Sequence, residues 1–244
     1  MAKTPSPILP IALCLLGALV PTVAAQEIAA RQSLGISSTF APDSSHILIG
    51  TAERRRTWTA GIDYDHIIWS NRILRLDYEG SIAPFFQERD PTLVGEYFTD
   101  IPGFTSIMLF NGQRVIYVNN YPLGSASSGG PPVPIYPLYG STKTYAAAIS
   151  PIGARITATG ARWIRPTFST DMGIVVSSDD LPVDDSASLN YMFSFGPGIE
   201  LSQSRGGSIR LEYLYRHISN ANSGYNNPGI DQGVIRLTLV HSFH

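Results

Sequence analysis

Hydrophobic and polar residues alternate with period two along most of the chain, the pattern of β-strands that have two different faces. Eight such segments are predicted, at 32–52, 57–68, 72–86, 144–158, 162–177, 188–202, 207–219 and 233–243. After the N-terminal region, no stretch approaches the roughly 20 uninterrupted apolar residues of a transmembrane helix. The pattern therefore predicts an all-β, antiparallel fold.

The two faces of these strands differ sharply in chemistry. The apolar face is rich in aromatic residues, whereas the polar face carries acids and arginines in nearly balanced number: Arg75, Asp77, Glu79, Arg165, Asp171, Arg210, Glu212, Arg216 and Arg236. Opposite charges can pair inside a closed barrel whose exterior touches lipid. We therefore expect an eight-stranded antiparallel outer-membrane β-barrel. A soluble sandwich or lipid-binding barrel, apolar inside and polar in water, is the alternative.

The lengths of the connections favour the membrane interpretation. The links after strands two, four and six are short, and those after strands three, five and seven, at 87–143, 178–187 and 220–232, are long. Short turns on the periplasmic side and long outer loops are typical of outer-membrane barrels. The first hairpin, at Glu53–Arg56, is predicted to be a tight exception, with arginines suited to lipid phosphates. Within the long outer loop at 87–143, residues 106–119 could form a hairpin around Asn111-Gly112, and 125–137 predicts a flexible loop.

The N-terminal 25 residues have the features of a secretory signal peptide. Lys3 precedes an apolar run at 8–20, and Ala24 and Ala25 are small residues at the expected cleavage site. A membrane anchor is the alternative. Cys14, the only cysteine, follows Leu13 rather than the small residue of a lipoprotein signal. The expected mature protein is thus a single barrel domain, 26–244, without disulfides.

Composition narrows the classes of partner. Only 15% of residues are charged and the net charge is −2, which argues against nucleic acid as a partner. His46, His66, His241 and His244 lack the convergent spacing of a metal site, so no metal or cofactor is expected. The acidic pairs at 179–180 and 184–185 are interpreted as a solvated loop, because calcium-loop spacing is lacking.

The candidate chemistry lies at the end of the seventh predicted strand. His217 and Ser219 share one face of that strand, about 7 Å apart at the backbone, so the imidazole could take the proton of the serine hydroxyl. Leu211 and Tyr213 have the same parity, which puts the pair on the lipid-facing stripe. A nucleophile there requires a membrane lipid as substrate.

Two further residues could complete such a site. A Gly-, Asn- and Pro-rich segment at 222–229 can fold back and bring Asp231 beside His217, where a carboxylate would orient the imidazole. Asn220 could donate a hydrogen bond to the developing oxyanion. On spacing alone, polar interface chemistry is the favoured interpretation of a His-x-Ser element at a strand end, and the resemblance described next changes that balance.

The segments 216–221 (RHISNA) and 227–231 (NPGID) resemble the signature of the outer-membrane lipid A 3-O-deacylase family, and 150–155 (SPIGAR) is similar to that family as well. The resemblance implies an eight-stranded barrel that removes the ester-linked 3-hydroxyacyl chain of lipid A. It implies Ser219 as nucleophile, His217 as base, Asn220 as oxyanion donor and Asp231 as the acid. The family's acid is glutamate, which is one methylene longer.

The resemblance thus implies a carboxylic ester hydrolase in the cell outer membrane, with lipid A as its partner and no cofactor. The oligomeric state stays open, a homodimer among the options. The competing hypothesis is a non-enzymatic eight-stranded barrel with a structural or adhesive role, in which the long outer loops bind the partner.

Overall fold

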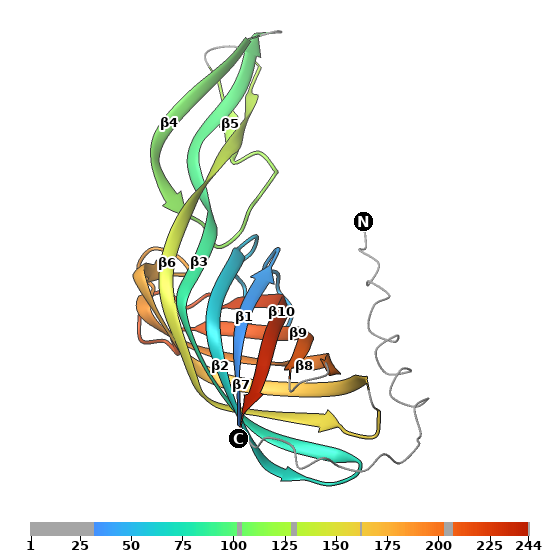
Figure 1. Cartoon of the computed structure of the whole chain (residues 1–244). Coiled ribbons are helices and arrows are strands. Elements are labelled where there is room, and N and C mark those ends of the chain that lie inside the picture. The colour runs from blue at the N-terminus through green and yellow to red at the C-terminus, as the bar shows by residue number, and fades with distance from the viewer. Residues whose placement is uncertain (1–31, 102–103, 128–130, 162, 203–206, 244) are drawn as a thin grey trace.

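In the computed structural model of the chain, the described residues are 32–101, 104–127, 131–161, 163–202 and 207–243 (Figure 1). The predicted signal peptide at 1–25 lies outside these residues. Within them, no helix is long and apolar enough to cross a membrane.

Eight strands close into a ring. The described residues form ten strands: β1 (Gln32–Ala41), β2 (Arg56–Ser70), β3 (Leu74–Ile101), β4 (Phe104–Arg114), β5 (Gly124–Ala126), β6 (Val133–Ala158), β7 (Ile164–Leu181), β8 (Ala187–Ser202), β9 (Gly207–Ser219) and β10 (Ile230–Phe243). The ring runs β1-β2-β3-β6-β7-β8-β9-β10, and antiparallel pairing of β10 with β1 closes it. The predicted eight-stranded antiparallel barrel is confirmed, and five of its strands, β2 and β7 to β10, lie close to their expected ranges.

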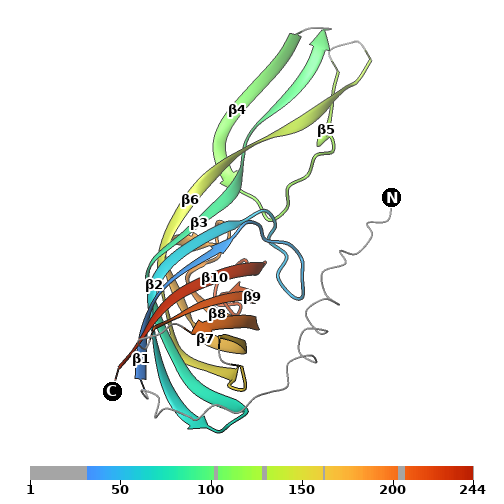
Figure 2. The same cartoon turned by 45° about the vertical axis from the view of Figure 1, so that its right-hand side comes forward.

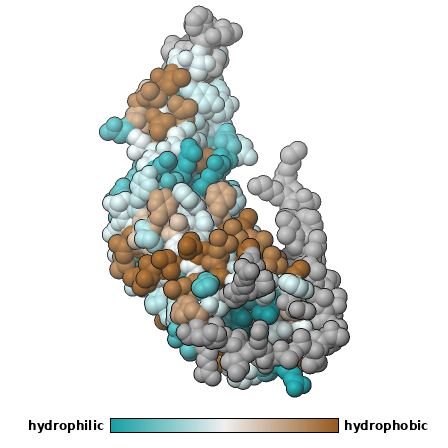
Figure 3. All heavy atoms as spheres, in the orientation of Figure 1, coloured by the Kyte–Doolittle hydropathy of each residue, from teal (hydrophilic) through white to brown (hydrophobic). Residues whose placement is uncertain are grey.

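Alternation along each strand separates an apolar exterior from a polar interior. On β2, Ile62 is 55% exposed whereas its neighbour Asp63 is 1% exposed. Figure 3 shows hydrophobic side chains as a belt across the visible face of the barrel. Members of the exposed apolar set include Leu34, Ile36, Trp58, Ile82, Phe168, Met172, Leu211, Tyr213, Ile235, Leu237 and Leu239. This is the polarity of a barrel that contacts lipid rather than of a soluble sandwich.

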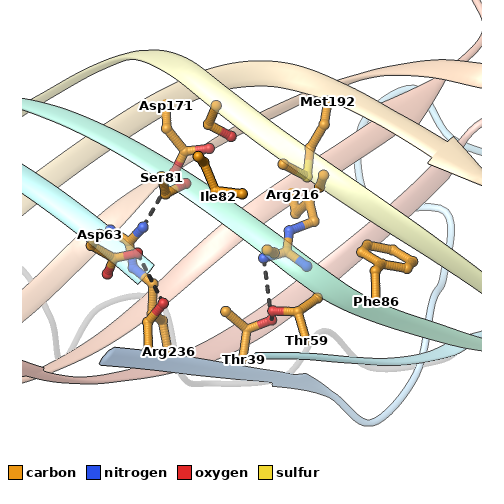
Figure 4. A pocket seen from close by; sticks show the side chains of 14 residues that line it. Thr39, Thr59, Asp63, Ser81, Ile82, Phe86, Asp171, Met192, Arg216 and Arg236 are labelled. Atoms are coloured by element: carbon orange, nitrogen blue, oxygen red, sulfur yellow. Dashed lines mark hydrogen bonds and ion pairs between the residues drawn. The ribbon is translucent and has the colours of Figure 1, made fainter. Parts of the chain in front are cut away.

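The interior is an ionic network. Arg236 contacts three carboxylates, with nitrogen–oxygen distances of 2.6 Å to Glu212, 3.0 Å to Glu79 and 3.4 Å to Asp171. Figure 4 shows Arg236 and Arg216 pointing into the same interior space. Because opposite charges lie within contact distance, each offsets part of the desolvation cost of the other.

An apolar cluster closes the interior at one end, which we call the loop end because it carries the connections 42–55, 182–186 and 220–229. The cluster comprises Ala52, Phe86, Ala148, Val175, Leu181, Met192, Ile218 and Ile230. Nearby, Arg55 is fully buried, 3.5 Å from Asp90 and 3.8 Å from Glu88. The described part of the barrel interior is therefore packed at this end.

The first connection differs from the sequence prediction. β1 ends at Ala41, not at residue 52, because Pro42 lacks the N–H that a strand pairing needs. Ser44 then pins the chain, since its hydroxyl donates to Ala52 O (2.8 Å) and accepts from Arg55 N (2.9 Å). The tight hairpin expected at Glu53–Arg56 is wrong: residues 42–55 form a long loop, and Arg55 points inward rather than toward lipid phosphates.

The predicted long loop at 87–143 is largely β-structure. β3 and β6 continue past the barrel rim and stay paired to Tyr97 and Tyr136, whose rings stack at 5.5 Å. β4 adds to β3, so the strands form an extension beyond the loop end (Figures 1 and 2). The hairpin turn expected at Asn111-Gly112 is wrong, because both residues lie within β4. The flexible loop expected at 125–137 is also partly wrong, since β6 begins at Val133 and pairs with β5.

We predict that Arg236→Met destabilises the barrel, because it leaves three buried carboxylates without their shared cation. The free energy of unfolding should fall by about 3–5 kcal/mol, measured by urea titration of the protein in lipid vesicles. Arg72→Met, at an exposed turn position, removes the same charge and should have little effect. Equal stability of the two variants would contradict the interior network.

Candidate active site

Three neighbouring strands supply the site at the loop end of the barrel. In the strand register, His217 of β9 lies opposite Asp231 of β10 and opposite Phe193 of β8. Cross-strand neighbours on one face meet side by side. His217 Nδ1 accordingly lies 2.7 Å from Asp231 Oδ1, and its ring centroid lies 5.3 Å from that of Phe193. The structure thus brings together two of the four predicted site residues by hydrogen bonding.

The pair belongs to the outward face of the barrel. His217 has the parity of the exposed Leu211 and Tyr213, and Asp231 has that of the exposed Ile235. Both are nevertheless buried, at 6% and 0% exposure, because the loop 42–55 and neighbouring rings cover them. The site is therefore a covered polar pair on an otherwise apolar surface.

Hydrogen bonds fix the charge and position of Asp231. Its Oδ2 accepts from the backbone N–H groups of Leu48 (2.6 Å) and Ile49 (2.9 Å), and its Oδ1 accepts from the Tyr215 hydroxyl (2.7 Å). A carboxylate only accepts, so His217 Nδ1 carries the proton and Nε2 presents its lone pair. This is the tautomer that a general base requires.

Two glycines permit the close packing around the pair. Gly229 has φ of 62°, in the left-handed region, and a Cβ there would lie 2.9 Å from His217 Cε1. Gly50 faces Asp231, where a Cβ would lie 2.6 Å from the backbone nitrogen. The backbone of the two loops can therefore approach the imidazole and carboxylate only if both positions lack a side chain.

Ser219 lies two residues beyond His217 on the same strand, half-buried and opposite Tyr191 of β8. Alternation gives it the outward parity of His217. Within the described part of the chain, no hydrogen bond joins its hydroxyl to the imidazole. The structure therefore does not contain the His217–Ser219 contact that sequence spacing suggested.

Asn220 is buried in the loop that follows β9. Its Nδ2 donates to Asn226 O (2.8 Å), its Oδ1 accepts from Asn222 N (2.9 Å), and its backbone N–H donates to Asn227 Oδ1 (3.1 Å). These bonds fold the loop so that Asp231 returns beside His217. One of the two amide N–H groups is used in this way, and the amide has a second.

Sequence reasoning missed four contributors to the site, two side chains and two backbone amides. Tyr215 and Phe193 carried a signal, because each shares the outward parity of its strand with the site. The Leu48 and Ile49 amides carried none, since a backbone donor leaves no trace in residue type. The described residues include no group of three or more His, Cys, Asp or Glu side chains that could hold a metal ion.

Comparison with known proteins gives structural likeness only. Neither protein-family models nor curated proteins match the sequence. Among solved structures, the chain is similar to the outer membrane enzyme PagL, with 14% identity, a TM-score of 0.49, and coverage of 84% of this chain and 97% of the other. It is also similar to Neisserial surface protein A (11%, TM-score 0.45, 89% and 100% covered) and to the β domain of the Bordetella autotransporter BrkA (11%, TM-score 0.29, 88% and 100% covered).

We predict that Gly229→Ala displaces His217, because the new methyl group would meet the ring and the backbone would be strained. The free energy of unfolding should fall by about 1–2 kcal/mol from the left-handed φ alone, measured in lipid vesicles. Gly124→Ala is the matched control, because a Cβ at that exposed position meets nothing within 4 Å. An unchanged His217 NMR resonance in Gly229→Ala would contradict the packing.

Proposed function

We propose that the chain is an outer-membrane serine esterase that hydrolyses the ester-linked 3-O-acyl chain of lipid A. The observation that carries the proposal is the His217–Asp231 pair, joined at 2.7 Å on the outward face of the barrel, with Ser219 two residues away at the same end of β9. A base held by a carboxylate, next to a serine, is the arrangement that nucleophilic ester cleavage uses.

The surface polarity supports a membrane location. An apolar belt around an ionic interior is favourable when the exterior contacts hydrocarbon. The loop end, with its long connections and its extension, would then face outward, and the short turns would face the periplasm. The site therefore lies where an acyl ester of an outer-leaflet lipid would meet the barrel wall.

The chemistry follows from the two nitrogens of His217. Nε2 takes the proton of Ser219 Oγ as that oxygen attacks the ester carbonyl carbon, and Asp231 stabilises the resulting imidazolium. The imidazolium returns the proton to the departing lipid oxygen when the carbon–oxygen bond breaks, leaving the acyl chain on Ser219. Water, activated by the same nitrogen, then releases the fatty acid. Asn220 would donate its second amide N–H to the oxyanion.

For this reaction the Ser219 hydroxyl must come within hydrogen-bond distance of His217 Nε2, a contact that the described residues do not make. Contacts of this type are often long before substrate binds and tighten in the reacting complex. The choice of lipid A over other esters rests on the resemblance of 216–221 and 227–231 to the lipid A 3-O-deacylase signature. In that comparison the shorter Asp231 stands where the family has glutamate, and the Leu48 and Ile49 amides support it directly.

We predict that Ser219→Ala abolishes deacylation, with a fall in kcat of about 10³-fold or more because the nucleophile is lost. The measurement is mass spectrometry of lipid A from cells that express each variant. Ser223→Ala, an exposed serine in the following loop, should leave deacylation intact. Unmodified lipid A with folded wild-type protein would favour the adhesive alternative, for which the exposed Ile107, Met108 and Leu109 of the extension supply a surface.

Asp231 offers a second test, in two substitutions. Asp231→Asn should lower kcat by about 10⁴-fold, because an amide no longer selects the tautomer with Nε2 free. Asp231→Glu keeps the charge but pushes the carboxylate past the Leu48 and Ile49 amides, so we expect partial activity between Asn and wild type. Full activity in Asp231→Asn, assayed on purified lipid A in detergent, would remove the residue from the mechanism.

A further inference from the structure

Three consecutive aliphatic side chains project from the loop that covers the site. Ile47, Leu48 and Ile49 are 45%, 59% and 59% exposed. Runs of large exposed aliphatic residues are unfavourable on a surface that faces water and mark a contact with lipid or another molecule. This segment, 47–49, therefore points to an apolar neighbour that the isolated chain does not supply.

The backbone on either side of the segment is anchored. Ser44 is buried and forms an isolated bridge to Gln232, and Ser45 N donates to Asp231 O at 3.1 Å. His46 Nδ1 lies 2.8 Å from Gly50 O, which closes the short loop between them. The segment is thus held against the start of β10, and Figure 2 shows the connection between β1 and β2 beside that end of the strand.

The position of the segment continues the apolar belt. Asp231 has the outward parity of Ile235, Leu237 and Leu239 on β10, which are 47%, 47% and 56% exposed. A backbone that contacts the Asp231 side chain therefore lies on the exterior of the barrel, not over its opening. The aliphatic side chains of segment 47–49 extend the lipid-facing stripe of β10 toward the loop end.

The same segment holds the acid of the site. The N–H groups of Leu48 and Ile49 both donate to Asp231 Oδ2, so any movement of the segment moves two of the carboxylate's hydrogen bonds. Tyr215 and His217 bind the other oxygen. Leu48 and Ile49 therefore each present an exposed side chain and a backbone N–H that binds Asp231.

We propose that segment 47–49 is a lipid-binding clamp: its aliphatic side chains insert among the acyl chains of the outer leaflet, and that contact fixes the two amides on Asp231. The inference rests on the proposed function, because it makes the acid's orientation depend on the lipid that presents the ester. Continuity with the belt selects lipid acyl chains as the occupant over a second copy of the chain. Leu48 and Ile49 are positioning residues in this scheme and do not touch the reacting atoms.

Lipid contact can be tested without any assay of activity. A nitroxide label is placed at position 48 by Leu48→Cys in a Cys14→Ser background, and the protein is reconstituted in phosphatidylcholine vesicles. The collision rate of the label with membrane-soluble oxygen should exceed its collision rate with a water-soluble nickel complex. The same result is expected for a label at Leu237→Cys in the belt. Leu109→Cys on the extension, which is 70% exposed, should show the reverse. A water-like result at position 48, or spin–spin broadening from a second copy, would overturn the proposal.

The positioning role has its own readout. Replacing Ile47, Leu48 and Ile49 together by Ser should lower kcat on lipid A in vesicles by about 10–100-fold. The conservative replacements Leu48→Ile and Ile49→Leu should keep kcat near the wild-type value. Replacing Ile107, Met108 and Leu109 by Ser is the matched control on the extension and should leave kcat unchanged. Full activity of the variant with Ser at 47–49 would refute the clamp. The proposed function is tested separately by Ser219→Ala. If wild type is inactive, the proposed function fails and the label still tests lipid contact.

Discussion

Closure of eight strands into a ring imposes one constraint on every strand residue: its side chain enters a packed ionic interior or lies on an apolar exterior. Two adjacent residues of β9 show how this constraint separates the two environments. Arg216 points inward, with its Nη2 3.4 Å from Thr39 Oγ1, whereas His217 points outward and binds Asp231. A shift of one residue in register would exchange these environments and leave an arginine facing hydrocarbon. The ion pairs inside and the polar pair outside therefore depend on the same register.

A buried carboxylate and its imidazole partner on the lipid-facing side are costly unless their hydrogen bonds are complete. The structure meets that requirement with local groups, since Asp231 accepts bonds from two amides, a tyrosine hydroxyl and the imidazole. The loop 42–55 supplies the amides and the cover, and Gly229 allows the neighbouring backbone to approach the ring. The wall of the barrel can thus hold a polar site at the border of the membrane while the surrounding face stays apolar.

Strand alternation was enough to predict the barrel and its polarity, because side-chain type reports directly on burial in a two-faced strand. The return of Asp231 to His217 was predicted from the Gly-, Asn- and Pro-rich segment 222–229 between them. The sequence prediction failed where contacts are made by the backbone rather than by side chains. Nothing in the residue types of Leu48 and Ile49 indicates that their amides bind a carboxylate. Pairing of β3 with β6 carried the strands beyond the rim, into the range 87–143 that was predicted as a long outer loop. Asn111-Gly112 has the composition of a turn, yet it lies within β4, at a register shift in the pairing with β3.

The central claim is that His217 and Asp231 activate Ser219 on the outer wall of the barrel. A long-chain alkyl fluorophosphonate tests it directly, because such a probe phosphonylates an activated serine that is reached from lipid. Peptide mass spectrometry of the reconstituted, folded protein should find one adduct, on Ser219, that forms far more slowly in His217→Ala. A folded barrel that acquires no adduct on Ser219, or acquires it at the same rate without His217, would contradict the account.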